Sequence, residues 1–386
     1  MTSLMPRGIK IYYVANARLP TEKAHGIQIA KMCEALIEAG ADVEVIAPRR
    51  ATDARSLKDF YGLRVDVPIT RLPTLDWYGR GRIGYWISSF VFMFAYRTYL
   101  RPKRRERAIL WAIDVDQFSF LFVPFLGIPY IAEIHDAKQW SLPFQALFRR
   151  AVAIVVINSA VRDALIRAFG ISGDKITVQP NGIDLAMFAP DKDKAAARRA
   201  LALPAEDRIA LYAGKFYSWK GLETMIDAAS LLAADARVYT VGGDAGELKK
   251  VTGRELPANL TAAGAREYRE MPMWLAAADV LLLFGTKKND YSYLHTSPMK
   301  LFEYMASGVP IVASATPANR AQVTEAEVFF YEPDNGESCA ETVRYVLSHP
   351  DEALARAGRA RESVAGFTWE KRARRILAAA GMQNFL

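Results

Sequence analysis

The sequence predicts an α/β protein built of two doubly wound, Rossmann-like domains that face a cleft. Three observations predict this fold class: short apolar runs alternate with helical patterns, these runs lack a polar face, and 386 residues exceed one ordinary core. Runs without a polar face are typical of parallel strands covered by helices on both sides. The alternation is interrupted near residues 181–194 and then restarts, which indicates a second sheet.

The first domain is predicted to cover residues 1–186. Its first strand is IKIYYVAN, and the segment GIQIAKMCEALIEAG that follows has apolar residues at helical spacing and ends at Gly40. A later helix, AVRDALIRAFG, precedes the last strand of this domain. The other strands are predicted at DVEVIAP (42–48), AILWAID (108–114), PYIAEIHD (129–136), AIVVINS (153–159) and KITVQP (175–180).

The second domain is predicted to cover residues 187–367, and residues 368–386 are predicted to form a helix that packs back on the first domain. The connector NGIDLAMFAPDKDK has an Asn-Gly turn, Pro190 and a charged run. After it, KGLETMIDAASLL has the apolar spacing of a helix. Strands are predicted at RIALYAG (208–214), RVYTVGG (237–243), NLTAAG (259–264), VLLLFG (280–285), VPIVAS (309–314) and VFFYEP (328–333).

Composition indicates a globular protein of a reducing compartment. Half of the residues are apolar and a quarter are charged. Cys33 and Cys339 lie in separate predicted helices, where buried reduced thiols suit the cytosol. The run at 9–16 is a strand pattern and not the apolar core of a signal peptide. We expect a cytoplasmic protein, with the cytoplasmic membrane face as a second expected location.

Basic residues are concentrated in one window. The net charge is +8, and residues 71–107 hold nine basic residues against Asp76 and Glu106, which gives +7 for this window alone. The adjoining run IGYWISSFVFMFAY is too short to span a bilayer, which takes about 20 residues. Two interpretations stay open: a core helix with a solvated basic tail, or in-plane contact of residues 80–107 with an anionic membrane. No nucleic-acid-binding motif accompanies the window, so a nucleic-acid partner is not expected.

Histidines occur at the predicted carboxyl ends of strands, where open parallel sheets bind ligands. His25 follows the first strand, His135 closes PYIAEIHD, and His295 follows VLLLFG. A histidine in such a loop also has an ordinary structural interpretation.

The segment YLHTSPMKLFEYM predicts an anion site at a helix start. Ser297 suits the N-cap and Pro298 the first helical position. Glu303, three residues after Lys300, suits acceptance of two hydrogen bonds from a ribose diol, although an ordinary surface ion pair of the two is the alternative. The backbone N–H groups of the next three residues are predicted to point at an anion, and the Lys300 side chain adds a positive charge to this site. The three residues are Met299, Lys300 and Leu301.

A second anion site is predicted in YAGKFYSWKGLETMIDAA. Lys215 follows a strand and Lys220 opens the next helix, so the two side chains could neutralise a diphosphate. Asp114 and Asp116 lack further ligands and are interpreted as a loop, and no zinc spacing is present. No metal and no other cofactor is expected.

Four motifs in order resemble those of retaining glycosyltransferases of family 4, which have the GT-B fold. They are GIQIAKMCEALIEAGADVEVIAP, PNGID before a Phe, GKFYSWKGLETMIDAA and KLFEYMASGVPIV, and FTWEKRARRIL resembles the C-terminal helix of such enzymes. The resemblance implies that Glu303 binds the donor ribose, that Lys220 binds the diphosphate and that Lys215 replaces a common arginine. It also implies that His135 faces the donor sugar and that Gly26 is the glycine of the first strand–helix loop.

The chain departs from the family at one position. The E-x7-E motif would place its first glutamate at 295, where this sequence has His295 followed by TSPMK. The version S-P-x-K-L-F-E-Y-M-A resembles that of a subgroup. Because a histidine can donate as well as accept, the preferred hydroxyl pattern of the sugar is expected to change.

The resemblance implies sugar transfer from a nucleoside-diphosphate sugar to a glycan or lipid-linked acceptor, in cell-envelope polysaccharide or glycolipid synthesis. Family members work by a front-face mechanism that needs no enzyme nucleophile. Two alternatives stay open: a nucleotide-sugar epimerase of GT-B shape, and a non-catalytic nucleotide-sugar-binding paralogue. The missing glutamate favours the second alternative, whereas Lys220 and Glu303 argue against it.

Overall fold

The computed structural model describes residues 8–51, 54–189 and 193–382. Its contacts divide the chain into two compact units. Unit 1 runs to Asn181 and takes up the chain again from Trp369, and unit 2 is Gly182–Thr368. The change of unit therefore falls five residues before the predicted boundary at 186. The connector forms helix α6 (Leu185–Phe188) in part, and its residues 190–192, including Pro190, lie outside the described residues.

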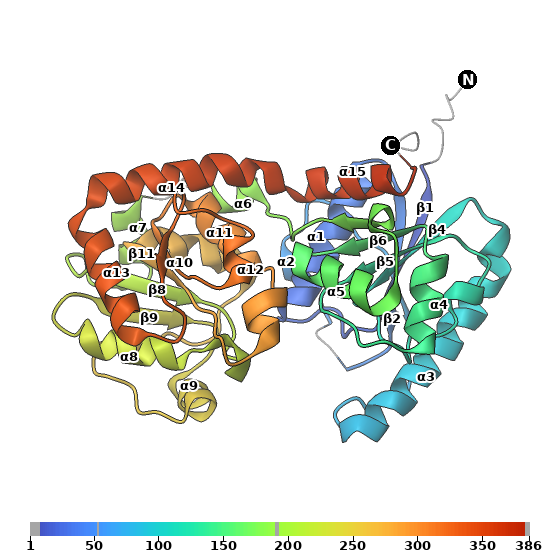
Figure 1. Ribbon diagram of the computed structural model, residues 1–386, viewed down its shortest axis with the longest axis horizontal. Coiled ribbons are helices and arrows are strands. Elements are labelled where there is room, and N and C mark those ends of the chain that lie inside the picture. The colour runs from blue at the N-terminus through green and yellow to red at the C-terminus, as the bar shows by residue number, and fades with distance from the viewer. Residues whose placement is uncertain (1–7, 52–53, 190–192, 383–386) are drawn as a thin grey trace. The chain divides into compact units, whose positions relative to one another are not determined.

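Unit 1 contains a seven-stranded parallel sheet in the order β3-β2-β1-β4-β5-β6-β7 (Figure 1). Strands run through the predicted apolar segments; the short edge strand β3 was not predicted. The strands are β1 (Lys10–Ala15), β2 (Asp42–Pro48), β3 (Ile69–Leu72), β4 (Ala108–Ile113), β5 (Tyr130–Ile134), β6 (Ala153–Val156) and β7 (Ile176–Val178). The helices are α1 (Ala24–Glu38), α2 (Leu57–Tyr61), α3 (Gly81–Leu100), α4 (Leu142–Arg150), α5 (Ser159–Phe169) and α15 (Trp369–Ala379).

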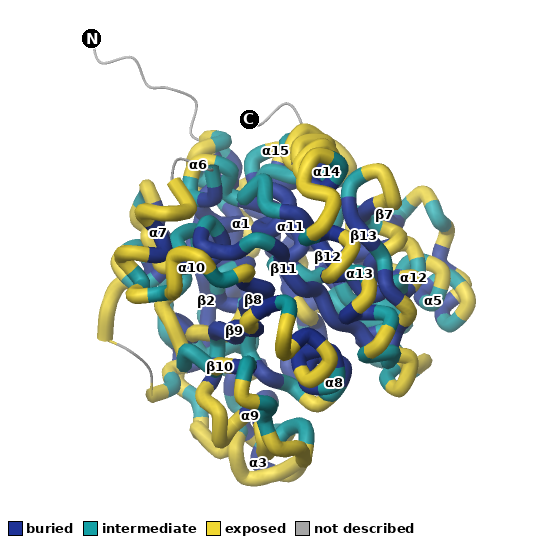
Figure 2. The backbone as a smooth tube through the Cα atoms, turned by 90° about the vertical axis from the view of Figure 1, so that its left-hand side faces the viewer, coloured by how far each residue is buried: buried dark blue, intermediate teal, exposed yellow. Residues whose placement is uncertain are grey.

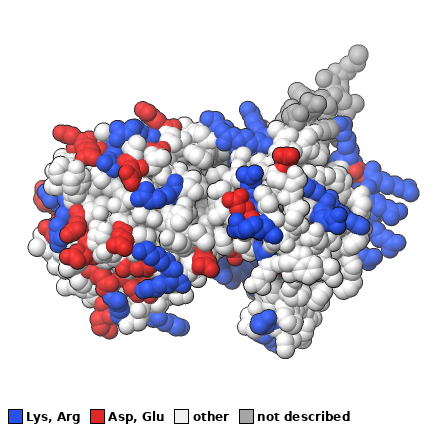
Figure 3. Space-filling view, viewed as in Figure 1, with Lys and Arg blue, Asp and Glu red and all other residues white. Residues whose placement is uncertain are grey.

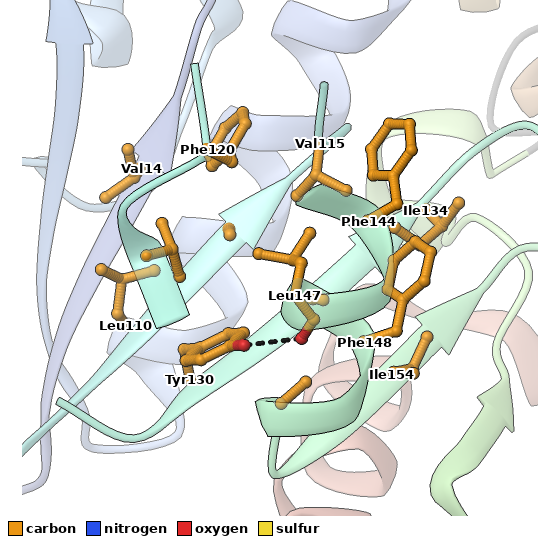
Figure 4. Close-up of a cluster of buried hydrophobic side chains, with 14 of the residues drawn as sticks. Val14, Leu110, Val115, Phe120, Tyr130, Ile134, Phe144, Leu147, Phe148 and Ile154 are labelled. Atoms are coloured by element: carbon orange, nitrogen blue, oxygen red, sulfur yellow. Dashed lines mark hydrogen bonds between the residues drawn. The ribbon is translucent and has the colours of Figure 1, made fainter. Parts of the chain in front are cut away.

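Successive side chains along each strand of unit 1 point to opposite faces of the sheet, and helices cover both faces. Tyr130 and Ile134 of β5 join a cluster that includes Leu147 and Phe148 of α4, and the Tyr130 hydroxyl donates to the Leu147 carbonyl over 2.6 Å (Figure 4). The opposite face is covered by α1, which packs against α15. The C-terminal helix thus completes unit 1; residues 383–386 of the predicted 368–386 segment lie outside the described residues.

Helix α3 has both a buried and an exposed apolar stripe. Phe92, Met93 and Tyr96 are fully buried in the core of unit 1. Ile83 is 69% exposed and Phe94 is 53% exposed. The basic 3-10 turn η1 (Arg101–Arg105) follows directly. The buried stripe agrees with the core interpretation of this segment, and membrane contact of the exposed stripe stays a prediction.

Unit 2 contains a six-stranded parallel sheet in the order β10-β9-β8-β11-β12-β13. The strands are β8 (Ile209–Ala213), β9 (Arg237–Val241), β10 (Leu260–Ala262), β11 (Val280–Leu283), β12 (Ile311–Ser314) and β13 (Phe329–Tyr331). The helices besides α6 are α7 (Lys194–Ala200), α8 (Glu223–Leu231), α9 (Ala245–Thr252), α10 (Met271–Ala277), α11 (Met299–Ser307), α12 (Pro317–Arg320), α13 (Gly336–Ser348) and α14 (Pro350–Val364).

The central strands of unit 2 are buried on both faces (Figure 2). Leu211 of β8 packs in one cluster with Phe302 of α11, whereas Ala210 packs in the other with Met225 of α8. This explains why β8 and β11 lack a polar face in the sequence. Two parallel sheets covered by helices confirm the predicted fold class.

Candidate functional site

The candidate site of unit 2 lies where the strand order reverses. Strand β8 stands between β9 and β11, so the loops that follow β8 and β11 leave adjacent strands at the same edge of the sheet. Such a switch point is where open α/β sheets bind their ligands. The loop after β8 carries Lys215 and Lys220, and the loop after β11 leads through residues 284–298 into α11.

Two lysine ammonium groups meet around the ring of Tyr212. The Lys220 Nζ donates to the Lys215 carbonyl over 2.8 Å and to the Tyr212 hydroxyl over 3.2 Å. The Lys300 Nζ lies 3.9 Å from the centroid of the Tyr212 ring. This nitrogen atom is buried, and the Lys220 side chain is its polar neighbour.

The environment opposes the positive charge of both lysines. Burial lowers the pKa of Lys220 to about 8. Burial, together with the neighbouring Lys220 charge, lowers the pKa of Lys300 well below its usual range. A buried ammonium without a partner is costly for a fold unless an anion completes the site.

Two glycines give the lysines their space. Gly214 follows β8 with φ +145°, and a Cβ there would lie 2.4 Å from the Lys300 Nζ. Gly242 follows β9 with φ +134°, and a Cβ there would lie 2.5 Å from the carbonyl of Gly214. Side chains at these positions would be strained and would collide with the site, so both need to be glycine.

Helix α11 is fixed to the end of β8 by Tyr304. The Tyr304 hydroxyl accepts a hydrogen bond from the Ala213 N–H over 2.8 Å. The side chains of Leu301 and Phe302 are fully buried beneath the helix. This packing places Lys300 and Glu303 of the same helix next to the loop after β8.

The start of α11 differs from the prediction in two respects. The N-cap is Pro298 and not Ser297, because the extended backbone of Pro298 postpones the first helical residue to Met299. The Leu301 N–H donates to the Pro298 carbonyl over 2.9 Å, so the prediction that this group is available to an anion is wrong. The backbone N–H groups that α11 can offer to an anion are therefore those of Met299 and Lys300. Ser297 is a buried residue before the N-cap.

Glu303 is buried, with 8% of its surface exposed. Burial raises the pKa of its carboxyl to about 7, although a hydrogen bond with Tyr268 and the charge of Lys300 act in the opposite direction. The alternative of an ordinary surface ion pair is therefore wrong. A carboxyl whose pKa is raised by burial, near the carboxyl ends of parallel strands, is a candidate functional group.

His295 closes the π-helical turn η6 (Tyr291–His295), four residues before α11 begins. Such turns are rare and occur frequently at functional sites. The turn is held by the Asn289 side chain, which accepts from the Ser292 N–H over 3.1 Å. His295 thus lies on the same loop as the start of α11.

His135 and Gly26 belong to unit 1. The His135 Nε2 lies 2.9 Å from Glu133 Oε1, just beyond the end of β5. A Cβ on Gly26 would lie 2.3 Å from the Tyr61 hydroxyl, so packing inside unit 1 by itself requires a glycine there. The structure therefore brings Lys215, Lys220, Lys300 and Glu303 together in unit 2, and describes His135 and Gly26 within unit 1.

Sequence reasoning missed several residues that build the site. Tyr212 and Tyr304 were hidden among apolar residues, and Tyr268 lies 35 residues before the carboxyl it contacts. The glycines were visible as YAG and VGG at the ends of two strands. A glycine directly after a parallel strand is the signal that could have identified them.

The fold and the site define a two-domain α/β protein with lysine side chains gathered at the switch point of its second sheet. Residues 26–187 match the model described as Glycosyltransferase Family 4, and residues 193–363 match the model described as Glycosyl transferases group 1. The two matches together cover most of the chain. The chain belongs to the glycosyltransferases with the GT-B fold.

Among curated proteins, the chain is similar to the D-inositol 3-phosphate glycosyltransferase 1 of Catenulispora acidiphila, at 30% identity over 65% of this chain and 66% of that protein. It is also similar to the D-inositol 3-phosphate glycosyltransferase of Xylanimonas cellulosilytica, at 29% identity over 45% of this chain and 43% of that protein. The chain thus spans from under half to about two thirds of the length of these relatives.

Among solved structures, Anabaena Alr3699/HepE in complex with UDP and glucose has a TM-score of 0.74 at 18% identity, covering 97% of this chain and 99% of that one. Sucrose-phosphate synthase (tll1590) from Thermosynechococcus elongatus has a TM-score of 0.75 at 19% identity, covering 95% and 97%. At this level of identity the likeness supports the fold.

Proposed function

We propose that this protein is a retaining glycosyltransferase that moves a sugar from a nucleoside-diphosphate sugar to a glycan or lipid-linked acceptor, in cell-envelope polysaccharide or glycolipid synthesis. The observation that carries the proposal is the pair Lys220 and Lys300, two lysines that meet around the Tyr212 ring in surroundings that oppose their positive charges. A diphosphate supplies two negative groups to such a pair.

The attraction between opposite charges is the reason why the Lys220–Lys300 pair favours a diphosphate ligand. Two unit charges 4 Å apart interact by about 4 kcal/mol at an effective dielectric constant near 20, and the interaction is stronger where water is excluded. The leaving diphosphate gains charge as the glycosidic bond breaks, so fixed ammonium groups stabilise the transition state more than the bound donor. Lys220, Lys300 and the backbone at Met299 would supply this stabilisation, with Lys215 beside them.

The remaining site residues are proposed to recognise the other parts of the donor. Glu303 in its ionised form accepts two hydrogen bonds from a ribose diol. His295 is proposed to contact the sugar, and His135 of unit 1 to face it. The HepE complexes hold UDP, glucose and UDP-glucose, which supports a uridine nucleotide as the first donor to test.

The proposal includes turnover without a metal ion, because lysines take the place of the divalent cation. In the described part of the chain, no three His, Cys, Asp or Glu side chains are grouped to hold a metal. We expect UDP-glucose, or another nucleotide sugar in a panel, to raise the melting temperature in excess EDTA. Sugar transfer to an added acceptor should also continue in EDTA. Complete loss of turnover in EDTA would contradict the metal-free mechanism, and failure of every nucleotide to bind would contradict the donor site.

A change at His295 should alter the choice of sugar. His295→Glu restores the family residue, which accepts but does not donate hydrogen bonds when ionised. We expect the ratio of kcat/KM between two epimeric donors to change about 10-fold, while the Kd of free UDP changes little. A variant that loses UDP affinity but keeps its donor preference would show that His295 contacts the nucleotide instead.

The acceptor is proposed to be held at an anionic membrane surface. On α3, apolar side chains at helical spacing face solvent: Ile83, Trp86, Ile87 and Phe94. The following turn exposes Arg101, Arg104 and Arg105. Lys and Arg side chains gather along the edge of unit 1 at the right of Figure 3. Each basic residue near an anionic surface contributes about 1 kcal/mol, and the apolar stripe suits shallow insertion. No helix in the described ranges is long and apolar enough to cross a bilayer.

Liposome sedimentation tests this surface. The protein is expected to bind vesicles containing phosphatidylserine at 20 mM salt and to be released at about 0.5 M, because the Debye length shortens well below 10 Å. Ile83→Ser/Phe94→Ser should weaken binding at both salt concentrations without changing the fold, since both side chains already face solvent. Leu354→Ser, an exposed apolar residue of α14 in unit 2, is the matched control. Equal binding to neutral vesicles, or none to either kind, would favour a soluble acceptor.

A further inference from the structure

A buried carboxylate with no part in the functions assigned above lies directly behind His135. Glu133 is on β5 and has no exposed surface. Its neighbours Ala132 and Ile134 belong to the cluster under α4, so Glu133 points to the opposite face of the sheet, which α1 covers. A charged side chain at such a position is costly unless it is fully paired.

Four side chains from different elements satisfy this carboxylate. Its Oε1 lies 2.6 Å from Arg372 Nη2 of α15, 2.9 Å from Gln28 Nε2 of α1 and 2.9 Å from His135 Nε2. Its Oε2 accepts from Trp111 Nε1 of β4 over 2.7 Å. Arg372 is itself buried and also donates to the Pro180 carbonyl over 2.8 Å.

The carboxylate is ionised in spite of its burial. Burial favours the protonated form, but the Arg372 charge and the bond with His135 outweigh it and lower the pKa of Glu133 to about 2. The other titratable groups that face it are Tyr13 and Cys33, and burial raises the pKa of both, which keeps them neutral. His135 in turn faces His25, whose pKa is lowered mainly by burial.

Ionisation fixes the position of a proton on His135. An ionised carboxylate only accepts hydrogen bonds, so the Nε2 of His135 must carry hydrogen in this contact. Nδ1 is then the ring nitrogen that is left for a ligand, since the bond made by one ring nitrogen sets the state of the other. Without Glu133, either tautomer would be available.

We propose that Glu133 is a positioning residue that keeps the proton of His135 on Nε2 and presents Nδ1 to the substrate, and that Arg372 makes this state depend on the docking of α15. The substrate part rests on the proposed function. The C-terminal helix thereby acts on His135 through a charge and not only through packing.

NMR of protein labelled with ¹⁵N-histidine tests the proton position without any substrate. Long-range ¹H–¹⁵N correlations at pH 8, assigned with His135→Gln, should show the His135 proton on Nε2. Glu133→Gln should abolish this preference, because a carboxamide can also donate. Arg372→Met, a substitution on α15, should also abolish the preference for Nε2, because the Glu133 carboxyl then loses its charged partner and takes up a proton. The proton on Nδ1 in the wild-type protein would overturn the proposal even if neither variant folds. A wild-type spectrum in Arg372→Met would overturn the dependence on α15.

Kinetics tests the functional part, which depends on a working transfer assay. Glu133→Gln should lower kcat by about 10-fold or more at nearly unchanged donor KM, as expected when a functional histidine loses its orienting partner. The matched control is Glu34→Gln, which breaks the equally buried Lys31–Glu34 pair of α1. Loss of stability in both variants with unchanged kcat per folded protein would reduce Glu133 to a structural role. If the wild-type protein transferred no sugar, the proposed function would fail while the NMR result would still stand.

Discussion

Lys220→Met is expected to lower kcat/KM for the donor by at least about 100-fold and to weaken binding of the free nucleoside diphosphate. The substitution keeps most of the side-chain volume but removes the ammonium that lies beside Tyr212 and Lys300. Removing one preorganised group that stabilises charge in a transition state commonly costs 10²–10³ in rate, so a loss of about this size is expected. Isothermal titration with UDP and steady-state kinetics measure the two effects.

The stability of the same variant should not fall. Because the folded-state pKa of Lys220 is lowered, the folded protein binds the proton less well than the unfolded chain, so the charged lysine costs stability at neutral pH. Met at this position removes that cost, and the melting temperature of the ligand-free variant should equal or exceed that of the wild type. Lys250→Met, on the exposed side of α9, is the control for loss of a charge from unit 2. Wild-type UDP affinity in Lys220→Met would contradict the assignment of the diphosphate site.

Glu303→Gln is expected to lower kcat/KM about 10- to 100-fold and to remove the acidic limb of its pH profile. In the free enzyme the Glu303 carboxyl has a pKa raised to about 7, so the ionised form that accepts from the ribose is lost as the pH falls below 7. The charged form of Lys220 is lost as the pH rises above about 8. The wild-type profile of kcat/KM should therefore be highest between about pH 7 and 8, and the amide variant should keep only the alkaline limb.

Tyr268→Phe provides a graded control for Glu303. The hydrogen bond from Tyr268 favours the ionised carboxylate, so its removal should raise the pKa of Glu303 and move the acidic limb to higher pH. An acidic limb that is the same in the wild type, Tyr268→Phe and Glu303→Gln would assign that limb to another group and remove Glu303 from the donor site.

The residues of the site differ in how much of their role could be predicted. Lys220, Lys300 and Glu303 were predicted as site residues because motif order and strand–loop position place such residues at the carboxyl ends of strands. The pKa shifts of the two lysines could not be predicted. They depend on Tyr212 and on the packing of α11 against a loop that lies about 80 residues earlier in the chain. The capping pattern at Ser297 was misassigned by one residue because Pro298 takes the extended conformation before the helix.

The sequence by itself determined the class of fold, the succession of strands and helices and the existence of two units, because periodicity and burial on both faces are local properties. The sequence left two interpretations of residues 80–107 open, because an apolar run does not determine which side of a helix is covered by the core. Only the tertiary structure decided that α3 has both a core stripe and an exposed stripe. It also brought Arg372 to Glu133, 239 positions apart in the chain. Such pairings depend on strand order and helix packing, which join residues that no local pattern connects.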